Sequence, residues 1–316
     1  MRQTRPITLI KHTRKLFTKL LTIRLNRILV KTKVLSPQNN SALPHTSTAA
    51  PISWLTNIQE DAWRNDKDFW ILSQDTSKAY DSVHLELLWK ALRRIKCPER
   101  FIEILRKLME ARENQVITNL GKTGRYIVED GLDQGSPLSP TLWRIYYDPL
   151  IARIAKEFKG YKMETTIPGG RTLECSMSVL AYMDDSLWIA DNLEELQKIV
   201  DTASSFYKLT KIKVNPAKSV FATNSKEEGD LIFEGGVMER RDQKEPFRYL
   251  GCWFGVLEKQ KEVREKIIEE ANQAIKRLNR ARITEKQYIY ITNCVLLTRI
   301  AYRTQNVVLS ENICER

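Results

Sequence analysis

The stretch "SVLAYMDDSLWIAD" (residues 178–191) places two adjacent aspartates, Asp184 and Asp185, between two apolar runs. The apolar runs predict a pair of strands over 178–190, with the aspartates at the tip between them. Neighbouring carboxylates repel each other, and no basic residue stands within six positions on either side. The pair therefore needs a cation from elsewhere in the chain or from outside it.

A third aspartate stands in a comparable place. The run "KDFWILSQD" (67–75) is apolar and ends at Asp75, which predicts a buried strand. Three aspartates at the ends of strands offer the hard oxygen donors that Mg²⁺ selects. The simpler alternative is that Asp184 and Asp185 only form a tight turn, because aspartate is a common turn residue. The apolar strands on both sides, Tyr182 before the pair and the lack of a glycine count against that alternative.

The rest of the chain interleaves helical and strand patterns. The spacing of apolar residues predicts helices over 10–31, 84–96, 99–112, 137–158 and 193–209, with a short helix near 53–64. Other patterns predict a polar loop over 35–52, a hairpin over 114–129, short strands between 213 and 254 and helices from about 256 onward. Helices and strands mixed around one sheet indicate the α+β class.

Positive charge is concentrated at the start of the chain. The net charge is +12 over 316 residues, and ten Lys and Arg residues precede Glu60, the first acidic residue. Such a block favours a polyanion partner, most simply nucleic acid. A solvated basic face and a mitochondrial presequence are the alternatives. The predicted helix over 10–31 is amphipathic, with an apolar side made of Phe17, Leu20, Leu21, Leu25 and Ile28.

The composition excludes a disordered protein and a membrane-embedded one. With 42% hydrophobic and 28% charged residues the chain is globular, and no apolar run approaches the ~20 residues of a membrane span. The five cysteines are scattered without a C-x-x-C pair, which argues against a disulfide framework and favours a reducing compartment.

Six segments together resemble one enzyme family. "YMDD" on a hairpin resembles motif C of reverse transcriptases, and "DTSKAYDSV" (75–83) resembles their motif A. "GLDQGSPLSPTLWRIYYDPL" (131–150) is similar to motif B of non-LTR (LINE-type) retrotransposon enzymes. "KVNPAKS" (213–219) is similar to motif D, and "RYLGCWF" (248–254) is similar to motif E. "RPITLIKHTRKLFTKLLTIRL" (5–25) resembles a fingers motif. The resemblance covers residues 5–255 in the family's order, is closest to fungal elements, and assigns the basic block to fingers rather than to a presequence.

The resemblance implies a right-hand polymerase fold. Its expected parts are a palm with a split βαβ core and an antiparallel sheet, fingers, and a partial helical thumb. The expected boundaries are partial fingers over 1–66, palm with motif A over 67–92, a fingers/palm insertion over 93–130, palm with motifs B to E over 131–255, and a partial thumb over 256–316.

The same resemblance implies the metal site and its partners. Asp75 and Asp184 would bridge two Mg²⁺ ions, Asp185 would complete the set, and the Thr76 carbonyl would add a ligand. The expected partners are an RNA template, a DNA primer and dNTPs, with no membrane. Tyr80 would be the steric gate that excludes a ribose 2′-hydroxyl, unless it is only a core aromatic residue.

Further roles follow from the other motifs. Gln134 and Gly135 would contact the nucleotide and template, and Arg5 would bind the triphosphate. Lys218 would act as a general acid near the leaving pyrophosphate, or is simply an exposed lysine after an Asn-Pro turn. The primer grip is expected at Tyr249, Leu250 and Gly251, where a tight hairpin is equally a feature of the fold.

The chain also departs from the family. Asp133 stands where an arginine is common, and Ser136 stands where a cysteine is common. The earliest fingers motifs, an endonuclease and an RNase H domain are missing, so the resemblance implies a truncated copy of an element protein. The alternatives are an inactive RNA-binding remnant and a group II intron-type reverse transcriptase. The expected location is intracellular, in the nucleus for target-primed integration, with the cytoplasm as an alternative.

Overall fold

The computed structural model describes residues 7–119, 121–167 and 171–311. Its centre is a five-stranded antiparallel sheet around β1 (Trp70–Ser77). One edge of β1 pairs with β9 (Asp185–Ala190), which pairs in turn with β8 (Val179–Tyr182). The other edge pairs first with β11 (Val220–Thr223) and then with β10 (Lys213–Val214). The strand predicted to end at Asp75 continues for two residues, because Thr76 and Ser77 pair with β10.

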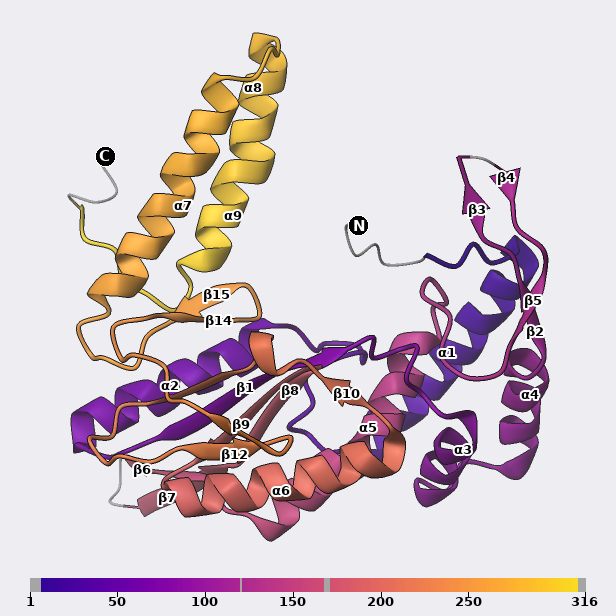
Figure 1. Ribbon diagram of the computed structural model, residues 1–316, viewed down its shortest axis with the longest axis horizontal. Helices are drawn as coiled ribbons and strands as arrows, with labels where there is room; N and C mark the ends of the chain where they lie inside the picture. Colours follow the sequence, from indigo (N-terminus) through magenta and orange to yellow (C-terminus); the bar gives the residue numbers. More distant parts are fainter. Residues whose placement is uncertain (1–6, 120, 168–170, 312–316) are drawn as a thin grey trace.

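Two helices, α5 (Ser139–Glu157) and α6 (Leu193–Thr210), cover one face of this sheet, and α3 (Leu85–Arg94) packs against α5. Their apolar residues form one core with Trp70, Leu72 and Trp188, which alternate along the strands with residues of the other face. Helix α5 is buried around most of its circumference, as expected for the long apolar run from which it was predicted. Figure 1 shows α5 and α6 side by side beneath the strands.

The opposite face packs against α2 (Ala49–Asn65) and the hairpin of β14 (Phe247–Tyr249) and β15 (Cys252–Phe254). Ile71, Leu187 and Ile189 are the sheet residues of this second core. The loop predicted over 35–52 is wrong at its end, because α2 begins at Ala49. Its buried residues Ile52, Leu55 and Ile58 repeat at helical spacing, so packing on the sheet extends the helix into the polar segment.

A second hairpin on this side was not predicted. Strands β6 (Tyr161–Ile167) and β7 (Arg171–Met177) pair along seven positions. Among the hairpin side chains whose burial is described, Tyr161 and Met177 at its base are buried, whereas Leu173 is exposed. The strands therefore carry charged residues instead of an apolar run, which removes the pattern by which a strand is predicted.

Two projections extend from the sheet (Figure 1). At one end, α1 (His12–Thr32) and α4 (Glu99–Met109) lie near a ribbon of four short strands. These strands are β2 (Arg112–Asn114), β3 (Ile117–Thr118), β4 (Gly121–Lys122) and β5 (Tyr126–Val128). At the other end, α7 (Lys261–Asn279) lies beside α8 (Glu285–Ile291), a π-helical turn (Thr292–Leu296) and α9 (Leu297–Arg303). The predicted hairpin over 114–129 and the helical C-terminal part are confirmed.

Three small elements complete the chain. A 3₁₀ turn (Pro216–Lys218) follows β10, and β12 (Leu231–Phe233) pairs with β13 (Gly236–Met238) beside α6. In the described part of the chain no helix is long and apolar enough to cross a membrane.

The amphipathic pattern predicted for 10–31 is only partly correct. The helix forms, but Phe17, Leu20 and Ile28 are exposed, and the buried side chains are those of Thr18, Leu25 and Leu29. The helix projects beyond the sheet (Figure 1), and Leu21, Leu25 and Leu29 are the apolar side chains through which it packs against the core.

Candidate active site

The three predicted aspartates meet at one end of the sheet. Asp75 and Asp185 are direct partners in the register of β1 and β9. Asp184 lies next to them in the turn between β8 and β9, where the Thr76 hydroxyl donates to its backbone carbonyl at 3.0 Å. The predicted strand pair over 178–190 with the aspartates at its tip is confirmed. Residues separated by more than a hundred positions thus come together through strand pairing alone.

The turn that carries Asp184 contains no glycine. Met183 takes the left-handed conformation instead, with φ 58°, which is uncommon for a residue with a side chain. The Trp143 indole N–H donates to the Met183 carbonyl at 2.8 Å, so α5 holds the turn from below. A strained turn with a dedicated hydrogen bond indicates that the position of Asp184 is fixed by the surrounding core.

The two partnered aspartates face the side of β14 and β15. Successive residues of a strand point to opposite faces, so Asp75 lies on the face of Ile71, and Asp185 on that of Leu187. The side chain of Asp75 is 31% exposed, and that of Asp185 is partly buried. Water and a substrate can therefore reach both carboxylates.

A buried chain of hydrogen bonds lies directly behind them, on the opposite face. The Tyr147 hydroxyl bonds to the Ser186 hydroxyl at 3.0 Å and to that of Tyr207 at 2.6 Å. The Tyr207 hydroxyl and the Trp188 indole N–H both donate to Gln74 Oε1, at 2.8 and 2.7 Å. Burial raises the pKa of Tyr147 to about 12, so its proton stays in this chain at neutral pH. The alternation of β1 and β9 predicts Gln74 and Ser186 on this face, but their tyrosine partners lie too far along the sequence to be foreseen.

The side chain of Lys218, another predicted site residue, forms an ion pair with Asp75. Its ammonium lies 3.3 Å from Asp75 Oδ2, and the Asn215 backbone N–H donates to the Asp75 carbonyl at 3.0 Å. Pro216 opens the 3₁₀ turn that ends at Lys218 and brings its side chain to the site. The lysine is 62% exposed, so its side chain can leave the carboxylate at little cost.

Tyr80 lies beside the turn of Asp184. Its ring contacts that of Trp143 edge-on, with 6.3 Å between the centroids. Burial, followed by the negative charge of Asp184, raises the pKa of Tyr80 to about 12, so the phenol is neutral. The predicted gate residue is therefore next to the carboxylates and partly buried.

Gln134 and Gly135 lie against the segment that precedes α1. The Thr8 backbone N–H donates to the Gln134 carbonyl at 2.8 Å. A Cβ added to Gly135 would come within 2.8 Å of the Thr8 carbonyl oxygen, and its φ of 128° is unfavourable for other residues. Gly135 is therefore required for the close approach of these two segments. Arg5, the predicted triphosphate ligand, lies outside the described residues.

The predicted primer grip forms the turn between β14 and β15. Leu250 and Gly251 both have positive φ, 47° and 89°, as a two-residue hairpin turn requires. Tyr249 is buried, and its hydroxyl donates to the Leu180 carbonyl at 3.1 Å. Burial, together with the charge of Asp185, raises its pKa well above the usual range. This hairpin therefore lies close to Asp185.

The donors present fit a hard divalent cation. Carboxylates at paired positions on adjacent strands, with a third in the next turn, are the oxygen ligands that Mg²⁺ takes. Lys218 already places a positive charge on Asp75. Within the residues that the structure describes, no group of three His, Cys, Asp or Glu side chains converges closely enough to form a cation site in this conformation.

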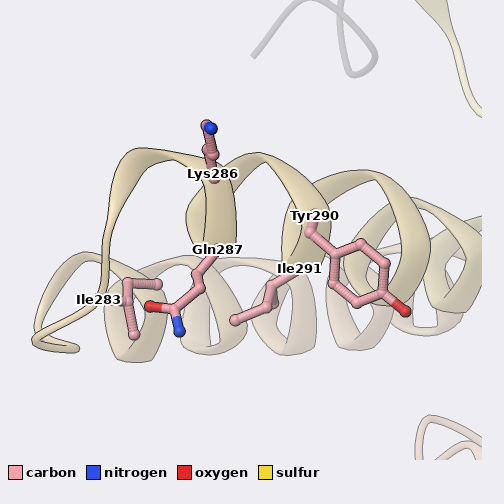
Figure 2. A pocket seen from close by; sticks show the side chains of 5 residues that line it. All are labelled: Ile283, Lys286, Gln287, Tyr290 and Ile291. Atoms are coloured by element: carbon pink, nitrogen blue, oxygen red, sulfur yellow. The ribbon is translucent and has the colours of Figure 1, made fainter.

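A hollow elsewhere has no connection with these residues. Figure 2 shows side chains of the α8 region around a space of about 370 Å³, lined by Ile283, Lys286, Gln287, Tyr290 and Ile291. It lies at the end of the α7–α9 projection that is farthest from the sheet (Figure 1). The predicted site residues are all absent from its lining.

Sequence comparison connects this site with retrotransposon proteins. The chain is 22% identical over 261 residues to a Retrovirus-related Pol polyprotein from the type-1 retrotransposable element R2 of Popillia japonica, which covers 79% of the chain and 41% of that protein. It is 21% identical over 280 residues to the Pol polyprotein of the type-2 element R2DM of Drosophila melanogaster, covering 84% of the chain and 25% of that protein. The chain thus spans less than half the length of these curated relatives.

Solved structures share the fold. Apo telomerase from Candida tropicalis superposes with a TM-score of 0.51 at 15% identity, covering 77% of this chain and 40% of that one. The same telomerase with a fragment of telomeric RNA gives a TM-score of 0.50 at 14% identity, covering 90% and 46%. The α+β architecture is therefore the right-hand polymerase fold, as expected. Residues 1–254 match the family described as reverse transcriptase (RNA-dependent DNA polymerase), and the chain belongs to this family.

Proposed function

We propose that this chain catalyses RNA-templated DNA synthesis as the polymerase part of a non-LTR retrotransposon protein. The observation that carries the proposal is the direct pairing of Asp75 with Asp185, with Asp184 in the adjoining turn. Like charges at paired strand positions cost stability, so a function that needs them together explains their presence.

Asp75, Asp184 and Asp185 would hold two Mg²⁺ ions, with the Thr76 carbonyl as a further ligand. The ions would supply Lewis-acid activation of the primer 3′-hydroxyl and neutralise charge on the triphosphate. The protein's own part is to fix the carboxylates, and the hydrogen bonds from Trp143 to the turn and from Tyr147 to β9 would serve this purpose. Lys218 would leave Asp75 and donate a proton to the pyrophosphate as it departs.

The neighbouring residues would select and position the nucleotide. Tyr80 would lie beneath the sugar and exclude a 2′-hydroxyl, which suits a neutral, partly buried ring beside Asp184. Gln134 and Gly135 would contact the base and template, and Arg5 would bind the triphosphate. Turn residues Leu250 and Gly251 would hold the primer end.

The chain would be divided into the subdomains of a right-hand polymerase. We assign partial fingers to 1–66, palm to 67–92 and 131–255, an insertion to 93–130 and a partial thumb to 256–316. An RNA template and a DNA primer would lie between the two projections, and the net charge of +12 on the whole chain favours polyanion binding. Target-primed integration would require the protein in the nucleus.

Primer extension tests the proposal. Purified chain, an RNA template annealed to a DNA primer, Mg²⁺ and dNTPs should give extended primer, and Asp184→Asn should abolish it. The matched control is Asp191→Asn, at a partly exposed aspartate just beyond the end of β9, which should retain activity. Retention of the RNA without extension by either protein would contradict the proposal and support an RNA-binding remnant.

A further inference from the structure

Asp133, the residue before Gln134, is buried and bound by two arginines from different parts of the chain. Arg112 Nη1 on β2 lies 2.7 Å from Asp133 Oδ1, and Arg14 Nη2 on α1 lies 3.1 Å from Asp133 Oδ2. Each carboxylate oxygen thus has its own guanidinium. The exposed fractions are 8% for Asp133, 3% for Arg112 and 33% for Arg14, so water screens little of the Arg112 pair.

The same arginines also hold backbone groups around Asp133. Arg112 Nη2 donates to the carbonyls of Asp130 and Gly131, at 3.0 and 2.7 Å. Arg14 Nη2 donates to the Leu108 carbonyl at 2.7 Å. We call Asp133, Arg112 and Arg14 the Asp133 clamp. Its planar, multiply bonded guanidinium groups fix orientation as well as distance.

The clamped loop is bonded to the residues that would face the nucleotide. The Leu132 N–H donates to the Tyr80 carbonyl, and the Gly131 N–H donates to the Val83 carbonyl, both at 2.8 Å. A Cβ at Gly131 would lie 3.2 Å from the Tyr80 carbonyl oxygen, so the two segments are in close contact. Gln134 follows directly in the chain. The loop therefore joins the Tyr80 segment on one side to Gln134 on the other.

We propose that Asp133 is a positioning residue of the nucleotide site, and the inference rests on the proposed polymerase function. Its carboxylate draws Arg14 of α1 and Arg112 of β2 onto one loop, and that loop sets how Tyr80 and Gln134 lie relative to each other. Asp133 itself does not touch the substrate. Without the carboxylate the loop gains freedom, which weakens nucleotide binding and sugar selection more than the chemical step.

Kinetics of Asp133→Asn test this. The amide keeps the shape but loses the charge that both arginines pair with. We expect the KM for dNTP to rise about tenfold, with kcat changed less, and the preference for dNTP over rNTP to fall. The double variant Asp133→Arg with Arg112→Asp restores one opposite-charge pair and should recover part of the KM. An unchanged KM and an unchanged sugar preference in Asp133→Asn would overturn the proposal.

Asp148→Asn is the matched control. Asp148 is fully buried and forms an ion pair with Arg94, but neither residue contacts the clamped loop. This variant should lower the unfolding temperature while the KM for dNTP stays at the wild-type value. An equal rise in KM for both variants would mean that general destabilisation is the cause, and would also overturn the proposal. If Asp133→Asn fails to fold, Arg14→Met, which removes only the partly exposed pair, is used in the same kinetic comparison.

Amide hydrogen exchange separates this inference from the function on which it rests. It is measured without substrate, at the Gly131 and Leu132 amides, which are bonded to the Tyr80 segment. Exchange there should be faster in Asp133→Asn than in the wild type, and unaffected in Asp148→Asn. If the wild-type chain extends no primer, the proposed function fails. Hydrogen exchange alone then tests whether the Asp133 clamp orders the loop. Equal protection in Asp133→Asn and the wild type would remove the clamp whatever the enzyme does.

Discussion

Asp75 and Asp185 are paired across β1 and β9, so two carboxylates face each other at positions where Cβ atoms lie about 4.5–5.5 Å apart. Like charges at such positions destabilise a sheet by roughly 0.2–1 kcal/mol. The arrangement that the proposed cation site requires therefore lowers the stability of the sheet.

Replacing Asp185 with Asn should remove the repulsion between the Asp75 and Asp185 carboxylates. We expect Asp185→Asn to unfold at a higher temperature than the wild type in a chelating buffer, by an amount corresponding to about 0.2–1 kcal/mol. Adding Mg²⁺ should stabilise the wild type and have a smaller effect on the variant, because a ligand stabilises only the state that binds it. Thermal unfolding with and without Mg²⁺ measures both effects. A variant less stable than the wild type in chelator would contradict the claim that repulsion between these carboxylates lowers stability.

Lys218 would compete with the proposed Mg²⁺ ions for Asp75. Lys218→Met removes an ammonium 3.3 Å from the carboxylate, so Mg²⁺ should bind more tightly while primer extension becomes slower. The lost ion pair is exposed and contributes less than about 1 kcal/mol, so the free energy of unfolding should barely change. Mg²⁺ titration of stability, together with single-turnover extension, tests the two parts separately. Weaker Mg²⁺ binding in the variant would mean that Lys218 helps to organise the site.

Tyr80 can be divided into ring and hydroxyl. Tyr80→Ala should admit ribonucleotides, whereas Tyr80→Phe, which keeps the ring against Trp143, should retain selection for dNTPs. Competition between dNTP and rNTP in primer extension measures the ratio. Unchanged selection in the alanine variant would leave Tyr80 as a core aromatic residue.

Tyr302 connects α9 with the predicted primer grip. Its hydroxyl donates to the Leu250 carbonyl at 2.7 Å and is hydrogen-bonded to the Thr48 hydroxyl at 3.0 Å, and its ring lies against Gly251. Tyr302→Phe should shorten the product made per binding event, and Tyr302→Ala should shorten it further, because ring packing is lost as well. Extension in the presence of a trap for dissociated enzyme measures this length. Products of wild-type length in both variants would separate α9 from the primer.

Alkaline pH should destabilise the protein through Tyr147. Because the folded pKa is raised to about 12 from an ordinary value of about 10, the unfolded state releases this proton first. The stabilisation is fully present below about pH 10 and is lost between about pH 10 and 12, by on the order of 2–3 kcal/mol. Tyr147→Phe should be less stable at neutral pH, where the bonds to Ser186 and Tyr207 are lost, but should show a shallower decline in that range. Denaturant unfolding over this pH range gives both slopes.

The sequence predicts the central strands and helices well, because their apolar residues repeat with strand or helix period over long segments. Asp75, Asp184 and Asp185 could be grouped because each lies near the end of an apolar run, and strand pairing does bring them together. Hairpin β6–β7 could not be predicted, since a strand that buries little has no apolar pattern.

The polar contacts around the candidate site were the part that the sequence predicted least. Arg14, Arg112 and Asp133 carry no local sign that they will meet, because the ion pairs span 119 and 21 positions along the chain. The Tyr147–Tyr207 pair is similar, since both residues fit an apolar helix face equally well. Burial of polar groups is settled by tertiary contacts, and only those contacts show which residues position the predicted site.

The pairing of β1 also determines when the site can exist. In the described structure all strands paired with β1 lie between residues 185 and 223, more than a hundred positions downstream. During synthesis, Asp75 therefore leaves the ribosome long before any strand that can pair with it. Such long-range closure is slow, and the exposed edges of β1 must be protected until then. An interrupted translation product that ends before β9 carries Asp75 and Tyr80 but lacks Asp185. Such an unfinished chain cannot bring the aspartates together and would lack the proposed polymerase activity.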